Sequence, residues 1–185
     1  MKLIPNLLSA ARLVLAPFLF LELWRREYGI ALVLCFVAGI TDAFDGLLAR
    51  KLQASSRIGA YLDPIADKIL LSGAFLTLAL DGAIEKWVAI LVFGRDAVIL
   101  LLAGGAFALT NIRSFPPSFW GKASTTAQIA YIVALLAHFV GFFPLPLVEL
   151  GKWIVAVLAV VSGSHYIWIA LSRLRRSSAE SMMKL

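Results

Sequence analysis

The sequence predicts an all-α integral membrane protein with six transmembrane helices and both termini cytoplasmic. Hydrophobic residues make up 61% of the 185 residues and charged residues only 15%, whereas a soluble domain is about half apolar and a quarter charged. The apolar residues also run together in stretches of about 20, the length that spans a bilayer core. No polar stretch is long enough for a second domain, so residues 1–185 are expected to form a single membrane domain.

Six apolar segments are expected to be helices, at residues 5–24, 28–50, 58–80, 86–109, 119–140 and 147–171. Short polar or Gly/Pro-containing turns separate them, and short turns place consecutive helices side by side and antiparallel. The first segment contains Arg12 and Pro17 and has no small-residue cleavage site, which favours a retained span over a signal peptide. In the third segment, Pro64 most simply marks a helix start capped by Asp63, although it could instead kink a helix that began near Gly59.

Basic residues in the turns indicate the orientation, because cytoplasmic loops carry an excess of lysine and arginine. With cytoplasmic termini, ten basic residues lie on that side and four on the other. The ten are Lys2, Arg50, Lys51, Arg57, Arg113, Lys122, Arg173, Arg175, Arg176 and Lys184, and the four are Arg25, Arg26, Lys86 and Lys152. We therefore expect an inner (cytoplasmic) membrane protein whose polar site faces the cytoplasm. The net charge of +6 suits an anionic leaflet better than nucleic acid, since no aromatic-basic interleaving accompanies it.

One segment stands out because it holds four aspartates in an otherwise apolar chain. It runs from Thr41 to Lys68 and reads TDAFDGLLARKLQASSRIGAYLDPIADK. Positions three or four residues apart share one face of a helix, so Asp42 pairs with Asp45 and Asp63 with Asp67. Four like charges in or next to lipid need positive charge among them. Carboxylate oxygens suit hard divalent cations, so the segment predicts a site for Mg²⁺ or Mn²⁺.

The same segment resembles the signature of the CDP-alcohol phosphatidyltransferases, integral-membrane enzymes that move a phosphatidyl group from a CDP-lipid to an alcohol. Eight signature positions fit without a gap over 26 residues: Asp42, Asp45, Gly46, Ala49, Arg50, Gly59, Asp63 and Asp67. The resemblance also touches Pro5-Asn6 through Arg12, and more loosely Gly94-Arg95-Asp96 and Gly121-Lys122. It implies that residues 1–185 form one domain of this family, typically a homodimer.

This resemblance implies phospholipid synthesis with two divalent metal ions, Mg²⁺ or Mn²⁺, and CDP-diacylglycerol as the donor. Two ions held a few ångströms apart can clamp both the attacking and the leaving oxygen. The expected metal ligands are Asp42, Asp45, Asp63 and Asp67, and Asp67 is also the expected catalytic base that takes the hydroxyl proton as CMP leaves. The expected CDP-lipid-binding residues are Asn6, Arg12, Gly46, Ala49, Arg50 and Gly59. Gly46 lacks a Cβ and so leaves room for the nucleotide, while Arg50 would pair with a phosphate.

Three basic residues are candidates for binding the acceptor: Arg95, Arg113 and Lys122. Arg95 could instead form a structural pair with Asp96, and Lys122 could merely anchor its helix at the lipid headgroups. For Arg12, the alternative to binding the donor is snorkelling to the interface.

The acceptor itself is predicted from the fourth apolar segment. Phosphatidylglycerophosphate synthases of the family carry an Arg-Glu there and a second arginine eight residues after the first, whereas this chain has Arg95-Asp96 and Ala103. A phosphate monoester with close to two charges would want that second arginine. Arg95-Asp96, together with the opening IPNLLSAARLVLAP and the segment PPSFWGKASTTAQ, looks more like the cardiolipin synthases, whose acceptor is phosphatidylglycerol. Glycerol-3-phosphate stays the main alternative, and inositol-phosphate, serine and choline acceptors stay open.

Two readings without this chemistry also remain. The aspartates could form ion pairs with Arg50, Arg57 and Lys68 that only hold helices together. An ion-coupled membrane transporter could use intramembrane carboxylates to bind its ion. Transporters often have inverted repeats and broken helices in both halves, and no repeat is visible here.

Overall fold

The protein is all α-helical over the residues that the structure describes. The computed structural model describes the backbone of residues 3–52, 59–109 and 118–182 and the side chains of residues 11–41, 68–102 and 118–172. Within these ranges lie six helices: α1 (Leu3–Trp24), α2 (Tyr28–Leu52), α3 (Gly59–Leu80), α4 (Lys86–Leu109), α5 (Phe119–Phe139) and α6 (Leu145–Met182). The predicted fold class is confirmed in its all-α part.

The first five helices begin and end within two residues of the predicted segments, and two details differ. Helix α3 begins at Gly59, so Pro64 lies inside a helix and does not start one. Helix α6 has 38 residues and continues to Met182, well past the apolar stretch that predicted it. Within the described residues, the stretch Leu145–Ser172 of α6 is long and apolar enough to cross a bilayer, with a mean hydropathy of 2.0. Helices α2 and α3 contribute shorter apolar stretches, Tyr28–Thr41 and Lys68–Leu80.

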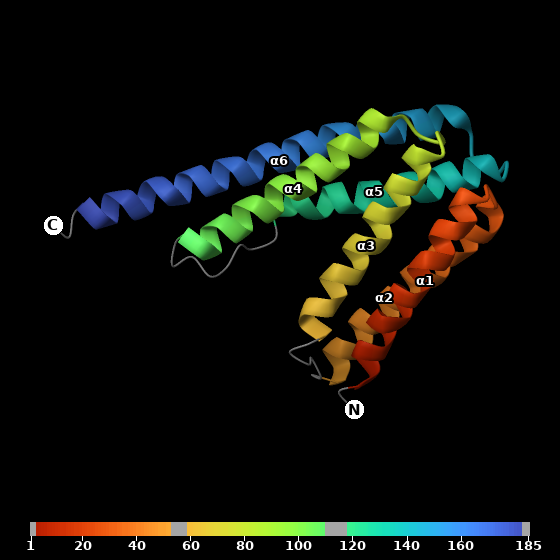
Figure 1. Ribbon diagram of the computed structural model, residues 1–185, viewed down its shortest axis with the longest axis horizontal. Coiled ribbons are helices and arrows are strands. Elements are labelled where there is room, and N and C mark those ends of the chain that lie inside the picture. Colours follow the sequence, from red (N-terminus) through yellow and green to blue (C-terminus); the bar gives the residue numbers. More distant parts are fainter. Residues whose placement is uncertain (1–2, 53–58, 110–117, 183–185) are drawn as a thin grey trace.

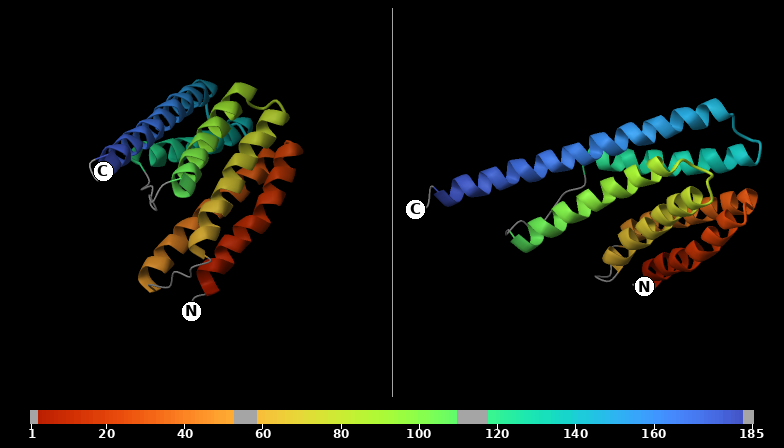
Figure 2. Two further views of the ribbon diagram at one scale, coloured as in Figure 1. Left: turned by 60° about the vertical axis from the view of Figure 1, so that its left-hand side comes forward. Right: turned by 45° about the horizontal axis from the view of Figure 1, so that its top comes forward.

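The helices form two groups of three. Helix α1 packs against α2 and α3, and α6 packs against α4 and α5. Contacts of α2 with α5, and of α3 with α4 and α5, join the groups. Figure 1 shows the two groups, with α6 extending beyond the other helices toward the C-terminus. In both views of Figure 2, the start of α1, the end of α2 and the start of α3 lie at the same end of the first group. That end carries the aspartate segment.

Side chains fill the space between the helices of the first group. Leu19, Leu23, Phe75 and Leu78 are fully buried where α1 meets α3. The two helices approach closely because α3 has Gly73 there. A Cβ at that position would collide with the ring of Phe20. The missing side chain of Gly73 therefore allows the ring to lie directly on the α3 backbone.

The outer surface is apolar as well. Ile90, Leu101 and Trp168 are 70%, 74% and 66% exposed. Large apolar side chains in such numbers on the surface indicate contact with another apolar phase. Lipid is that phase for a chain of this composition, which agrees with the predicted membrane location.

At the end opposite the aspartate segment, three helices stop in the same way. Helices α3 and α5 are followed by Gly82 and Gly141 with φ of +77° and +88°, and α1 by Arg26 with φ of +61°. The N–H of Phe142 reaches back to the carbonyl of Ala137 at 2.8 Å, which is the hydrogen bond of a Schellman motif. Glycine adopts this backbone at no cost, whereas arginine does not.

Ion pairs hold this opposite end together. The Arg26 Nε donates to Asp81 Oδ1 at 3.1 Å, which ties the turn after α1 to the turn after α3. Lys152 of α6 is buried, and its Nζ lies 2.6 Å from Glu85 Oε1, just before α4, and 2.5 Å from Glu149 Oε2. The hydrogen bond from Lys152 lowers the pKa of the Glu85 carboxyl.

Candidate active site

The eight signature residues lie on two helices that meet at one end of the molecule. Asp42 and Asp45 lie three residues apart on α2, with Gly46, Ala49 and Arg50 on the following turns. Gly59, Asp63 and Asp67 lie on the first turns of α3. Because α2 ends and α3 begins at the same end (Figure 1), both aspartate pairs are on helical segments of that end. Their side chains fall outside the described residues, so the convergence of the four carboxylates stays a prediction.

Next to these segments, a cavity of about 330 Å³ is lined by the helices of the first group and by α5. Its lining near the aspartate end comprises Arg12 of α1, Gly39 of α2, Lys68 of α3 and Thr125 of α5. Gly39 is one helical turn before Asp42, and Lys68 directly follows Asp67. The cavity therefore begins where the signature segments are.

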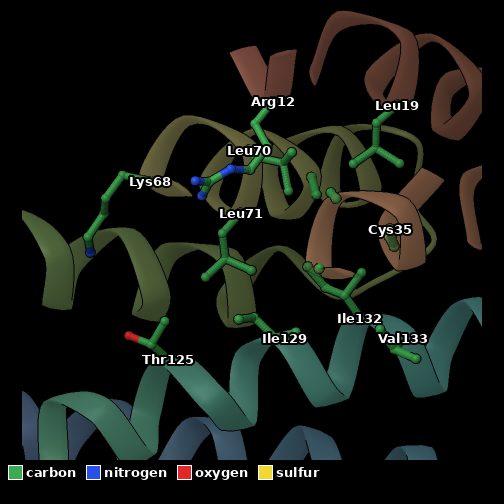
Figure 3. A pocket seen from close by; sticks show the side chains of 13 residues that line it. Arg12, Leu19, Cys35, Lys68, Leu70, Leu71, Thr125, Ile129, Ile132 and Val133 are labelled. Atoms are coloured by element: carbon green, nitrogen blue, oxygen red, sulfur yellow. The ribbon is translucent and has the colours of Figure 1, made fainter. Parts of the chain in front are cut away.

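The cavity changes from polar to apolar along its length. Figure 3 shows the nitrogen atoms of Arg12 and Lys68 toward one side of the view and Leu19 and Cys35 toward the other. Arg12 is 3% exposed although it carries a full charge. A space with cations on one side and hydrocarbon side chains on the other is suited to an amphiphile with an anionic head. Asn6 lies on the first turns of the same helix, α1, and its side chain falls outside the described residues.

Arg95 and Asp96 form a buried network that joins four helices. The Arg95 Nη1 donates to Asp96 Oδ1 at 2.6 Å. Its Nε donates to Ser162 Oγ of α6 at 3.2 Å, and its Nη2 donates to the Gly121 carbonyl of α5 at 3.2 Å. The Lys68 ammonium of α3 pairs with the same Asp96 oxygen. The structural pair that the sequence left open for Arg95 is thus present, and it includes a second cation.

This network depends on a glycine at the start of α5. Ser118 caps the helix by accepting from the Gly121 N–H at 3.0 Å, and the Ser118 N–H donates to the Tyr166 hydroxyl at 3.0 Å. A Cβ on Gly121 would come within 3.1 Å of the Tyr166 oxygen and 3.3 Å of Arg95 Nη2. The following residue, Lys122, is exposed. Arg113, the third expected acceptor residue, lies outside the described residues.

Sequence reasoning did not find the role of Lys68 as the partner of Asp96. It considered Lys68 only as a partner of the signature aspartates. The structure pairs its ammonium with Asp96, a carboxylate outside the signature. A usable signal was present, since opposite charges inside apolar segments are expected to pair with one another.

The donor set fits a divalent cation by its chemistry. Carboxylates three and four residues apart on helices offer the oxygen ligands that Mg²⁺ and Mn²⁺ prefer. Among the residues whose side chains are described, no group of three His, Cys, Asp or Glu could hold a metal ion. The four signature aspartates do not belong to that set, so the expected metal ligands remain predictions.

The sequence is similar to a known family and to known proteins over most of its length. The sequence profile of the CDP-alcohol phosphatidyltransferase family matches residues 2–169. A protein of Haemophilus influenzae is 32% identical over 173 residues, covering 90% of this chain and 92% of its own. A protein of Bacillus subtilis is 33% identical over 193 residues, covering 91% and 96%, and one of Escherichia coli K12 is 37% identical over 140 residues, covering 72% and 76%. All three are named CDP-diacylglycerol–glycerol-3-phosphate 3-phosphatidyltransferase.

Proposed function

The chain belongs to the CDP-alcohol phosphatidyltransferase family, and from this premise we propose that it transfers the phosphatidyl group of CDP-diacylglycerol to glycerol-3-phosphate, releasing CMP. Membership of this family makes the chain an enzyme of this class, and it excludes the hypothesis of an ion-coupled membrane transporter. The observation that carries the acceptor is the shared name of relatives that are 32% to 37% identical over most of the chain.

The relatives favour glycerol-3-phosphate over phosphatidylglycerol, the acceptor that the sequence analysis preferred. That preference rested on Ala103, which stands where a second arginine was expected. The inference assumed that a second positive charge could come only from that position of α4. A cation from another helix would supply the same second positive charge.

The proposed reaction is a displacement at the phosphorus that carries the diacylglycerol. The acceptor hydroxyl forms the new bond to phosphorus, the bond to the CMP oxygen breaks, and the electron pair leaves with CMP. Asp67 accepts the hydroxyl proton, and Asp42, Asp45 and Asp63 would hold two Mg²⁺ or Mn²⁺ ions together with it. Such ions supply charge neutralisation at the attacking and leaving oxygens. Asn6, Arg12, Gly46, Ala49, Arg50 and Gly59 would bind the donor, and Arg95, Arg113 and Lys122 would face the acceptor.

We further propose that all six helices cross the inner membrane, with both termini and the aspartate segment in the cytoplasm. The ten-to-four distribution of basic residues supports this orientation. CDP-diacylglycerol would enter from the lipid with its head at the polar side of the cavity and its apolar part toward Leu19. A homodimer remains the expected assembly.

CMP release by the purified protein tests the reaction and the acceptor together. With CDP-diacylglycerol and Mg²⁺, we expect release with glycerol-3-phosphate and little with phosphatidylglycerol. EDTA should stop the release, and added Mg²⁺ or Mn²⁺ should restore it. Release with phosphatidylglycerol alone, with cardiolipin as product, would keep the family chemistry and overturn the proposed acceptor. Turnover that resists the chelator would count against metal catalysis.

A further inference from the structure

The proposed acceptor requires more positive charge than α4 provides. A phosphate monoester carries about −1.5 to −2 charges at neutral pH. The candidate cation of α4 is Arg95, and the position eight residues later is Ala103. The inference below rests on the proposed function, because it concerns the binding of that phosphate.

Lys68 is the cation that the fold brings to this place. Its ammonium pairs with Asp96, the neighbour of Arg95, although 27 residues separate Lys68 from Arg95 in the sequence. The Lys68 side chain is 47% exposed, whereas the Arg95 side chain is 6% exposed. Lys68 also lines the cavity, and Figure 3 shows its ammonium on the same side of the view as the guanidinium of Arg12. An incoming anion can therefore reach Lys68 more readily than Arg95.

The hydrogen bonds of Arg95 and Lys68 also favour Lys68 as the group that binds an incoming anion. Arg95 has five N–H donors, and four of them donate within the protein, to Asp96, Ser162 and Gly121. Most of its hydrogen-bonding capacity is therefore used internally. An ammonium has three N–H donors, and among the residues whose side chains are described the pair with Asp96 uses one. Within that part of the chain, Lys68 keeps donors for a phosphate while it stays held in place.

We propose that Lys68 binds the phosphate of the acceptor and that Asp96 is a positioning residue that holds the Lys68 ammonium at the site. Arg95 anchors Asp96 through the same carboxylate oxygen. The three side chains together carry one net positive charge, and the cation missing at Ala103 is supplied by α3.

Lys68 directly follows Asp67 on α3, and we assign it to the acceptor on this ground. Consecutive Cα atoms are about 3.8 Å apart, and Asp67 is the proposed base for the acceptor hydroxyl. The reacting hydroxyl and the phosphate of glycerol-3-phosphate sit at opposite ends of a three-carbon chain. A long side chain from the next residue can span that distance while Asp67 contacts the hydroxyl.

Steady-state kinetics of Lys68 variants test the proposal. Lys68→Met keeps the length and removes the charge, and Lys68→Gln is a second neutral variant in case the first does not fold. A hydrogen bond to a charged group is worth a factor of about ten or more in affinity. We expect the KM for glycerol-3-phosphate to rise about tenfold or more, with the KM for CDP-diacylglycerol unchanged. Lys68→Arg keeps the charge and should recover most of the acceptor affinity.

The matched control is Lys152→Met, because Lys152 is also a lysine that bridges helices through carboxylates, but at the opposite end. It should leave both KM values unchanged. An unchanged KM for glycerol-3-phosphate in a folded neutral Lys68 variant overturns the proposal, as does a rise confined to CDP-diacylglycerol. Wild-type protein that uses only phosphatidylglycerol would instead overturn the proposed function, so the two failures are distinct.

A double-mutant cycle tests the role of Asp96. Asp96→Asn alone should raise the KM for glycerol-3-phosphate, because the ammonium is no longer held by a charge. In the Lys68→Met background it should add nothing further, since Asp96 acts through Lys68. Additive increases would mean that the two residues act independently and would overturn the positioning role.

Discussion

Asp67 is the residue on which the proposed chemistry depends most. Asp67→Asn preserves size and removes the carboxylate that takes the acceptor proton. General-base catalysis contributes about 10²- to 10⁴-fold, so CMP release should fall by at least that factor while CDP-diacylglycerol binding stays largely intact. Rates of CMP release and equilibrium binding of labelled donor measure the two effects.

Asp81→Asn is the matched control, because Asp81 lies in the turn after α3 and pairs with Arg26 at the opposite end. It should reduce thermal stability and leave CMP release close to wild type. Near-normal turnover of Asp67→Asn would remove Asp67 as the base.

At the scale of single residues, the sequence predicted which residues share a face of one helix, but it missed contacts between side chains of two different helices. The spacing of Asp42 and Asp45, or of Asp63 and Asp67, follows from the helical repeat alone. The pairing of Lys68 with Asp96 depends on how α3 and α4 are rotated about their axes, which spacing along one helix does not determine. For the same reason, the absence of arginine at position 103 was a poor guide to the charge of the acceptor site.

At the scale of helices, apolar length predicted where the first five begin and end. It failed at α6 because the residues after Ser172 are mostly polar, yet they include no glycine or proline before Met182. Arginine, alanine and glutamate favour helix, so α6 continues beyond the apolar stretch. At Pro64 the expectation of a helix start was wrong. A proline inside α3 removes one backbone hydrogen bond, and the helix nevertheless extends to Gly59.

The close approach of α1 and α3 leads to a prediction about stability. Gly73→Ala places a Cβ where the Phe20 ring lies, so the helices must separate or the ring must move. Overpacking of this kind costs about 1–3 kcal/mol, which outweighs most or all of the roughly 1 kcal/mol that alanine gains over glycine in a helix, and we expect a lower melting temperature in detergent than for the control below. Tryptophan fluorescence or circular dichroism during heating measures it.

Gly94→Ala in α4 is the control, because nothing lies within 4 Å of a Cβ at that position. Alanine favours helix over glycine by about 1 kcal/mol, so this variant should be as stable as wild type or more so. Equal losses of stability in both variants would contradict the close contact at Gly73.

At the scale of the whole molecule, one end of the helix bundle is structural and the other carries the candidate active site. The end opposite the aspartate segment is closed by left-handed helix termini and by the ion pairs of Arg26 and Lys152. The other end carries the signature segments, the polar side of the cavity and the network of Lys68, Asp96 and Arg95. This division fits an enzyme that takes a lipid from the membrane and a water-soluble substrate from one side only. The chemistry thus requires the aspartate end to face the compartment that holds the acceptor.

Labelling of single cysteines tests that orientation. Cys35, the one cysteine of the chain, is first replaced by serine. Lys86 lies at the start of α4 and Lys122 at the start of α5, at opposite ends of the bundle, and both are exposed. A membrane-impermeant maleimide applied to intact cells should label Lys86→Cys, whereas Lys122→Cys should react only after permeabilisation, because the basic residues favour a cytoplasmic aspartate end. The reverse pattern would place the active site outside the cytoplasm, and labelling of both in intact cells would contradict a bundle that crosses the membrane.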